Sequence, residues 1–258
     1  MITSYFRYWL AAKDEHAIHS PFVFELYTKV IHPRKNVLSP VFQEIESIRR
    51  QMKASQEEIT IVDYGAGSKK NNSPQRKIST IAKNAQKTPK FSQLIFRLIQ
   101  HFQPGTIFDL GTSLGITTLY EAKAAPTSTI RSFEGCPETA RVARRNLDAL
   151  EAKQVEIIVG NLDETLPKQV NHTAAIDFAF FDANHRYEPT IRYFETCLEK
   201  AHENSIFVFD DIHWSDEMEK AWTDIQAHPR VIVTIDLFFV GLVFFRKKQP
   251  RQHFILKY

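Results

Sequence analysis

Three carboxylates and a histidine stand where two apolar segments of this chain end. Asp182 closes the segment IDFAFFD and precedes His185 by three residues, while Asp210 and Asp211 close the segment SIFVFDD. If these segments are neighbouring strands of a parallel sheet, their carboxyl ends meet at one edge and the three carboxylates converge there. Such carboxylates repel one another unless a cation lies between them. Oxygen donors of this kind suit Mg²⁺, Mn²⁺ or Ca²⁺ better than a soft metal.

These residues also admit plainer interpretations. Asp182 and Asp210 could cap the N-termini of helices, or contact a cofactor with no metal present. His185 could pair with an acid or cap a loop. The neighbouring His213 and Trp214 could line a substrate site, or the tryptophan could simply pack.

A second candidate site is the glycine-bearing turn in FDLGTSLGITT (108–118). It has the form acid–x–Gly–x–x–x–Gly, with Gly111 and Gly115, between an apolar segment and a helix-like one. Because Thr112 and Ser113 stand between the glycines, the turn lacks the G-x-G-x-x-G arrangement of dinucleotide sites. The chain also has no lysine-bearing phosphate loop. The turn therefore favours an unphosphorylated nucleoside over a diphosphate, unless it is only a tight turn.

Two later segments strengthen the case for a nucleoside. TIRSFE ends at Glu134, 19 residues beyond Gly115, and Gly135 follows it. An acidic side chain at about this spacing can accept hydrogen bonds from ribose hydroxyls. In VGNLDETL, Gly160 and Asn161 could border an adenine ring, or could form a glycine-containing loop with an asparagine cap.

Short segments rich in Ile, Val and Phe predict the buried strands that would position these residues. They are TIFDL (106–110), TIRSFE (129–134), VEIIVG (155–160), IDFAFFD (176–182) and SIFVFD (205–210). Amphipathic stretches between them predict helices over 137–150 and 215–226, where Pro137 suits the first helical position and Ser215 an N-cap. This alternation predicts an α/β fold with a parallel sheet covered by helices. At the end, VIVTIDLFF, Gly241 and LVFFRKK predict an antiparallel hairpin at the sheet edge.

From about residue 90 to 246 the chain resembles the class I S-adenosylmethionine-dependent methyltransferases, whose motifs it keeps in order. The resemblance implies a Rossmann-like, seven-stranded, mostly parallel sheet of order 3-2-1-4-5-7-6, with strand 7 antiparallel. It implies S-adenosylmethionine as the cofactor. The cofactor-binding residues predicted on this basis are Asp109, Gly111, Thr112, Ser113, Gly115, Glu134, Gly135, Asn161 and Asp182.

The acidic strand ends are similar to those of metal-dependent O-methyltransferases of the catechol, caffeoyl-coenzyme A and sugar types. The resemblance implies that Asp182, Asp210 and Asp211 bind a divalent cation and that Asp182 and His185 are catalytic, with His185 as the general base. A hydroxyl whose pKa is lowered by the cation would lose its proton to His185 and attack the sulfonium methyl. The expected substrate is a small molecule with a hydroxyl group. The N-terminal substrate segments of those families do not clearly correspond to this one.

Residues 1–89 are predicted to form a helical N-terminal extension, and 90–258 the methyltransferase domain. YFRYWLAA, PFVFELYTKVI and PVFQEIESIRRQM have helical periodicity and are separated by prolines. The extension could cap the sheet and select the substrate, or could form an oligomerisation surface such as that of a homodimer. HAIHSPF (16–22) and DYGAGS (63–68) receive no chemistry from this reasoning.

Charge is unevenly distributed along the chain. Residues 1–104 hold 16 Lys and Arg against 8 Asp and Glu, whereas 105–258 hold 17 against 22. The basic part could attract an acidic substrate, nucleic acid or an anionic membrane surface, or could be a solvated face that docks on the acidic domain. A methyltransferase acting on RNA or protein is thus one alternative, although no RNA-binding motif supports it. A non-catalytic adenosine-ligand-binding protein is another, which the convergent acids and His185 argue against.

Composition limits the remaining function classes. The chain is 43% hydrophobic and 24% charged, and its net charge is +3. These values are ordinary for a globular protein, and no run approaches the roughly 20 apolar residues of a membrane helix. The N-terminal residues lack the pattern of a signal peptide. Cys136 and Cys197 show no metal-like or redox-like spacing, so a reducing cytoplasm is expected.

Overall fold

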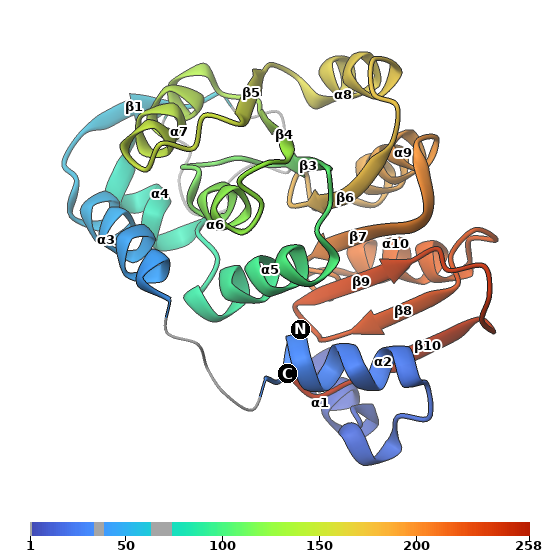
Figure 1. Ribbon diagram of the computed structural model, residues 1–258. Coiled ribbons are helices and arrows are strands. Elements are labelled where there is room, and N and C mark those ends of the chain that lie inside the picture. Colours follow the sequence, from blue (N-terminus) through green and yellow to red (C-terminus); the bar gives the residue numbers. More distant parts are fainter. Residues whose placement is uncertain (1, 34–38, 63–73) are drawn as a thin grey trace. The chain divides into compact units, whose positions relative to one another are not determined.

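The computed structural model describes residues 2–33, 39–62 and 74–258, and Figure 1 shows their path. The segment DYGAGS lies outside the described residues. Contacts divide the chain into two compact units. The split unit comprises Met1–Lys35 and Gln169–Tyr258, and the continuous unit comprises Asn36–Lys168. The predicted division into an extension over 1–89 and a domain over 90–258 stays a prediction.

The continuous unit contains three parallel strands, each followed by a helix. The strands are β3 (Thr106–Leu110), β4 (Thr129–Glu134) and β5 (Val155–Val159), paired in that order. The helices are α6 (Ile116–Ala124), α7 (Pro137–Ala149) and α8 (Leu162–Asn171), the last three residues of which are assigned to the split unit. The predicted strands 106–110 and 129–134 are confirmed to the residue. Their interior positions, such as Ile107, Phe108 and Ile130, are fully buried, as expected for strands covered on both faces.

Helices and a short strand pair precede this sheet in the continuous unit. They are α3 (Pro40–Ala54), β1 (Glu58–Thr60), β2 (Gln75–Lys77), α4 (Ile78–Asn84) and α5 (Pro89–Phe102). The antiparallel pair β1–β2 was not predicted. Thr88 accepts a hydrogen bond from the Phe91 amide and begins α5, and α5 packs against α6.

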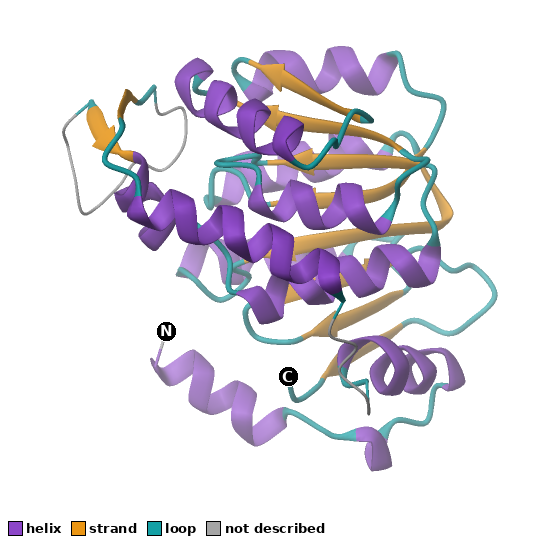
Figure 2. Cartoon of the chain, turned by 60° about the vertical axis from the view of Figure 1, so that its left-hand side comes forward, coloured by secondary structure: helices purple, strands orange, loops and turns teal. Residues whose placement is uncertain are grey.

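The split unit contains five strands in the order β10-β8-β9-β7-β6. They are β6 (Ile176–Phe181), β7 (Ala201–Asp210), β8 (Val233–Asp236), β9 (Val240–Phe244) and β10 (Gln252–Ile255). β6 and β7 are parallel, and β9 is antiparallel to both β7 and β8. Helices α9 (Tyr187–Leu198) and α10 (Asp216–Ala227) follow β6 and β7. Figure 2 shows the strands in orange and the helices in purple.

The N-terminal helices of the split unit lie beside its last strand, far away in sequence (Figure 1). They are α1 (Ile2–Ala11), η1 (Glu15–Ala17), α2 (Pro21–Leu26) and the π-helical η2 (Tyr27–Ile31). The Lys13 amide donates to the Ile255 carbonyl at 2.9 Å, and the Tyr8 hydroxyl donates to the Leu256 carbonyl at 2.5 Å. These bonds fasten α1 and the residue Lys13 after it to the segment around β10.

The motif HAIHSPF has a structural explanation. Ser20 accepts a hydrogen bond from the Val23 amide and caps α2, and Pro21 occupies its first turn, where its missing N–H is not needed. The Phe22 ring meets Phe244 edge-on at 5.1 Å and lies under the Arg246 guanidinium at 4.2 Å. The motif therefore begins a helix and anchors it to β9.

The predicted α/β class and Rossmann-like sheet are confirmed. Strand order β5-β4-β3 in one unit and β6-β7-β9-β8 in the other follows the predicted sequence of strands, with β9 as the antiparallel strand. The predicted number of seven was wrong, because an eighth strand, β10, pairs in parallel with β8. Its sequence QHFI is short and half polar, so it carries little of the apolar signal that identifies a buried strand.

The terminal hairpin was predicted correctly in direction and wrongly in detail. Gly241 lies inside β9, and the chain turns at 237–239, where Asp236 accepts the Phe238 amide at 2.8 Å. Gly241 instead leaves room for the Trp222 ring, since a Cβ there would come within 2.5 Å of it. Because β9 lies between β7 and β8, the hairpin is not at the sheet edge.

Across the described ranges 2–33, 39–62 and 74–258, the helices are too short or too polar for any of them to traverse a bilayer.

Candidate functional site

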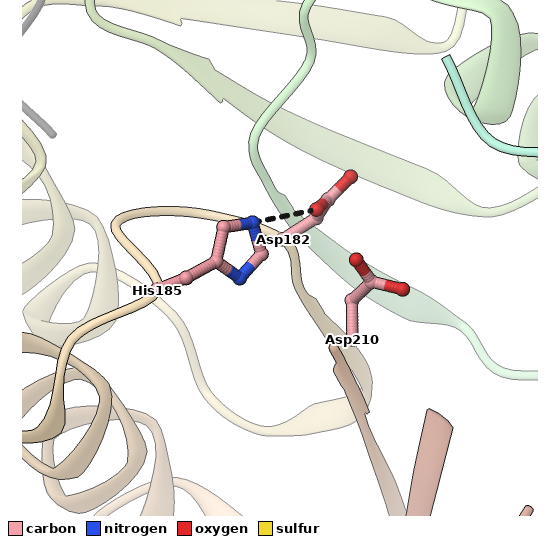
Figure 3. A group of neighbouring side chains, drawn as sticks. All are labelled: Asp182, His185 and Asp210. Atoms are coloured by element: carbon pink, nitrogen blue, oxygen red, sulfur yellow. Dashed lines mark ion pairs between the residues drawn. The ribbon is translucent and has the colours of Figure 1, made fainter. Parts of the chain in front are cut away.

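The predicted acidic residues of the split unit converge beyond the ends of two parallel strands. Asp182 directly follows β6, and Asp210 ends β7. Nε2 of His185 lies 3.5 Å from Oδ1 of Asp182 and 4.0 Å from Oδ2 of Asp211. Figure 3 shows the Asp182, His185 and Asp210 side chains turned toward one another; one ligand atom from each lies within 4.8 Å of the others. The structure thus brings together the four residues predicted to form this site.

Burial differs among the members of this acidic cluster. Asp210 is 2% exposed, whereas the side chains of Asp182, His185 and Asp211 are 14%, 26% and 27% exposed. A buried carboxylate is costly unless a partner or a cation compensates it. The cluster therefore has a buried floor at Asp210 and a more accessible side at His185 and Asp211.

The structure excludes one of the alternatives left open for the two aspartates. The N-cap of α9 is Arg186, and that of α10 is Ser215, whose hydroxyl accepts from the Met218 amide. Neither Asp182 nor Asp210 therefore caps a helix. His185 does pair with acids, and this pairing is also the geometry that would orient a general base.

The loop after β7 is held by the β8–β9 turn. Asp211 adopts a left-handed backbone with φ of 53°, which is uncommon for a residue other than glycine. Its amide donates to the Phe239 carbonyl at 2.7 Å, and its carbonyl accepts from the Trp214 amide at 2.9 Å. Trp214 is 49% exposed, so it is not the packed core residue that one interpretation expected.

His213 is the centre of a hydrogen-bonded group that the sequence reasoning did not assemble. Its Nε2 lies 2.8 Å from Oδ2 of Asp236, its Nδ1 lies 3.3 Å from Oε1 of Glu219, and its ring stacks on Phe238 at 5.2 Å. Burial lowers the pKa of His213, but hydrogen bonds and charge from both acids outweigh it and raise the pKa above its ordinary value. Asp236 was missed because it ends a strand 23 residues after His213, and Glu219 because its position in the first turn of α10 suggests only a favourable charge at the start of that helix.

Burial and hydrogen bonding also shift the pKa of Glu219, in α10, in opposite directions. Burial raises the pKa of Glu219, while hydrogen bonds from Ser4 and His213 lower it below the ordinary value. The contact with Ser4 brings α1 to the same group. His213 thus links α10, the β8–β9 turn and, through Glu219, the N-terminal helix.

The glycine-bearing turn lies in the continuous unit and is held by Glu134. The amides of Gly111 and Thr112 both donate to the Phe133 carbonyl, at 3.2 and 2.9 Å. The Ser113 amide donates to Oε2 of Glu134 at 2.9 Å, and the Cys136 amide donates to Oε1 at 2.9 Å. Glu134 therefore holds the turn after β3 to the end of β4, and its predicted contact with a ribose stays a prediction.

Gly115 satisfies two requirements at the end of this turn. Its φ of 78° is left-handed, and a Cβ would lie 3.2 Å from the Cβ of Ala143 on α7. A residue with a side chain would be strained in its backbone and would press the turn away from that helix. Gly115 is thus required both by the backbone conformation of the turn and by its close approach to α7.

Asp109 supports the turn from inside the fold. It is fully buried, and its Oδ2 accepts hydrogen bonds from the hydroxyls of Thr118 and Ser132, both at 2.6 Å. The Ser132 hydroxyl in turn lies 2.5 Å from that of Thr112. These contacts assign Asp109 a positioning role, and its predicted contact with a cofactor stays a prediction.

The segment around Gly160 and Asn161, predicted to border an adenine ring, also has a local structural role. Oδ1 of Asn161 accepts from the Asp163 amide at 3.0 Å, so Asn161 caps α8. The Gly160 amide donates to the Glu134 carbonyl at 3.0 Å, which places this loop beside Glu134 and the following Gly135. A contact between Asn161 and an adenine ring stays a prediction.

Comparison of the sequence with known proteins identifies related chains. Residues 108–212 match a family described as a methyltransferase domain. A catechol O-methyltransferase of Niastella koreensis is 32% identical over 126 residues, which are 48% of this chain and 55% of that protein. A human transmembrane O-methyltransferase is 33% identical over 82 residues, which are 31% of this chain and 28% of that protein. The chain thus spans about half, or less, of the length of these curated relatives.

Solved structures share the fold at low sequence identity. A methyltransferase of Podospora anserina bound to S-adenosylhomocysteine superimposes with a TM-score of 0.61 at 13% identity, covering 83% of this chain and 91% of that one. An O-methyltransferase of Bacillus cereus in complex with S-adenosylhomocysteine gives a TM-score of 0.57 at 16% identity, covering 86% and 97%. These likenesses extend the similarity in fold beyond the segment matched by sequence.

Proposed function

We propose that this chain, whose residues 108–212 match the methyltransferase domain family, transfers a methyl group from S-adenosylmethionine to a hydroxyl oxygen of a small molecule. We further propose that a divalent cation assists the reaction at Asp182, Asp210 and Asp211. The convergence of these carboxylates with His185 is the observation that carries the proposal.

A divalent cation fits the donor set of the split unit. Asp182 and Asp210 offer carboxylate oxygens within 4.8 Å of one another, and Asp211 lies within 4.0 Å of the same histidine. Carboxylate oxygens are the ligands that Mg²⁺, Mn²⁺ and Ca²⁺ prefer. A cation bound there would supply charge that lowers the pKa of an acceptor hydroxyl.

His185 is placed to accept the proton of that hydroxyl. A histidine ring can act as a general base, and Asp182 at 3.5 Å can orient the ring and stabilise the imidazolium after proton transfer. The side chain is about one quarter exposed, so the proton can pass on to solvent. Asp182 would therefore serve both the cation and the base.

The residues of the glycine-bearing turn fit a nucleoside cofactor. Glu134 would accept hydrogen bonds from the ribose hydroxyls, while Gly111 and Gly115 let the backbone approach the ligand. The buried Asp109 network fixes the turn beneath them. S-adenosylmethionine supplies an electrophilic methyl group when it is bound. The relative named a catechol O-methyltransferase supports a hydroxyl acceptor over a nitrogen or carbon one.

Calorimetric titrations of the whole chain test the two parts separately. S-adenosylhomocysteine is titrated into EDTA-treated protein with and without added Mg²⁺, and Mn²⁺ is titrated alone. We expect nucleoside binding in both conditions, and a cation signal that disappears in Asp210→Ala. Asp177→Ala is the matched control, because Asp177 is a partly exposed acid of the same unit paired with His202.

Activity completes the test. Methylation of catechol and of a panel of hydroxylated compounds is followed by release of S-adenosylhomocysteine. His185→Ala should lose turnover while keeping nucleoside binding. Absence of nucleoside binding would overturn the proposed methyl transfer, and absence of a cation signal in the unmodified chain would remove the cation from it.

A further inference from the structure

The group around His213 is not used by the proposed mechanism, yet it adjoins one of the acids. His213 follows Asp211 by two residues in the loop between β7 and α10. Its two ring nitrogens contact Asp236, at the end of β8, and Glu219, in the first turn of α10. The loop that carries Asp211 is thus tied on both sides.

The two carboxylate oxygens of Asp236 contact different partners. Oδ1 accepts from the Phe238 amide at 2.8 Å, and Oδ2 contacts His213 at 2.8 Å. The side chain is only 6% exposed, so water competes little for these bonds. One carboxylate therefore shapes the β8–β9 turn and holds the histidine of the Asp211 loop.

The turn completes the connection to Asp211 through its backbone. Phe238 has a left-handed φ of 69°, a conformation that is strained for an aromatic residue. The following residue, Phe239, presents its carbonyl to the Asp211 amide at 2.7 Å. Asp236 thus stabilises the turn conformation that places the Phe239 carbonyl where it accepts the Asp211 amide.

Helix α1 covers the same group. The Tyr5 ring meets Phe238 edge-on at 4.9 Å, and the Tyr8 ring lies at 5.3 Å from it. Ser4 makes a hydrogen bond with Glu219. Two aromatic side chains and one hydroxyl of α1 therefore close over the stacked pair formed by Phe238 and His213.

We propose that His213 is a positioning residue for Asp211, and that Tyr5 and Tyr8 of α1 hold it in place through Phe238. The inference rests on the proposed function in so far as Asp211 serves a cation. It gives α1 a part in assembling the acidic cluster.

The experiment compares His213→Ala and the double variant Tyr5→Ala/Tyr8→Ala with the unmodified chain. Mn²⁺ affinity is measured by electron paramagnetic resonance, and exchange of the Asp211 and Trp214 amides by hydrogen–deuterium exchange. Residues that orient metal ligands typically change affinity by about 10- to 100-fold, so we expect losses of this size with faster exchange at both amides. Urea unfolding is measured in parallel, so that the comparison is made on folded protein.

His202→Ala is the matched control. His202 also contacts an aspartate, with Nε2 at 2.7 Å from Oδ1 of Asp177, but it stands at the beginning of β7, whereas Asp210 stands at its end. It should leave Mn²⁺ affinity and Asp211 exchange unchanged even if it lowers stability. Tyr5→Phe, which retains the ring on Phe238, should behave like the unmodified chain.

The two proposals fail in different ways. If the unmodified chain binds no Mn²⁺, the proposed cation site is refuted, while amide exchange still judges the positioning role. If His213→Ala and the tyrosine variant remain folded and exchange the Asp211 amide at the unmodified rate, the positioning role is overturned. Equal Mn²⁺ affinities of His213→Ala and the unmodified chain, where the latter binds, would also overturn it.

Discussion

Gly241→Ala is the substitution whose effect follows most directly from the packing of β9. Gly241 pairs with Phe209 on one side and Asp236 on the other, and its missing side chain faces the Trp222 ring. A Cβ would lie 2.5 Å from two ring atoms and 2.9 Å from a third. Ordinary van der Waals contact begins near 3.4 Å, so the ring or the strand must move by nearly 1 Å.

The size of the effect is a balance of two contributions. Overpacking of a well-filled core typically costs about 1–3 kcal/mol, and Trp222 is buried and has little room to move. Alanine also lowers the conformational entropy of the unfolded chain, which favours the folded state by about 0.4–1 kcal/mol. We therefore expect a net loss of about 1–2 kcal/mol in the free energy of unfolding.

Urea denaturation followed by tryptophan fluorescence measures this loss, and a double-mutant cycle assigns it. In a Trp222→Phe background the distal ring atoms are gone, so adding Gly241→Ala should cost much less than it does in the unmodified chain. Equal costs in the two backgrounds, or a Gly241→Ala variant as stable as the unmodified chain, would refute the steric reasoning.

Two further predictions concern other parts of the chain. Glu134→Gln replaces one of the two carboxylate oxygens that accept the Ser113 and Cys136 amides. Because charge-assisted hydrogen bonds contribute about 1.5–3 kcal/mol, the affinity for S-adenosylhomocysteine, measured by calorimetry, should fall by about tenfold or more. Unchanged affinity would argue against the role of Glu134 in the turn. Burial raises the pKa of the Cys197 thiol, and Cys136 is also buried. A thiol reagent at pH 8 should therefore label both cysteines slowly in the native chain and quickly in urea. Rapid labelling of Cys197 in the native chain would contradict its burial.

The parallel strands and the acidic cluster could be predicted because their signals are local. Each strand is a short apolar run, and an acid or glycine directly follows it. Asp182 and Asp210 are brought together by the rule that parallel strands end at one edge, so their proximity needed no knowledge of side-chain packing. The same holds for Glu134 and the turn at Gly111.

What could not be predicted depends on partners distant in sequence. Gly241 has the signature of a turn, yet its role is set by a tryptophan 19 positions earlier, on α10. The turn itself contains no glycine, because the Asp236 carboxylate stabilises a left-handed phenylalanine. His213 likewise meets Asp236 and Glu219 only once β8 and α10 are in place. Side-chain contacts of this kind leave no periodic trace in the sequence.

The split unit is formed by two segments from opposite ends of the chain, and this affects the order in which the chain can fold during synthesis. Its N-terminal helices are made first, but their partners on β8, β9 and β10 lie more than 200 residues later, whereas the continuous unit is encoded without interruption between them. Pairings of such high sequence separation form slowly and late, and domains generally fold as the ribosome delivers them. The continuous unit can therefore fold while the Tyr5 and Tyr8 rings of α1 still lack Phe238, the side chain that they contact in the folded structure. Until the β8–β9 turn is synthesised, these rings stay exposed on the nascent chain.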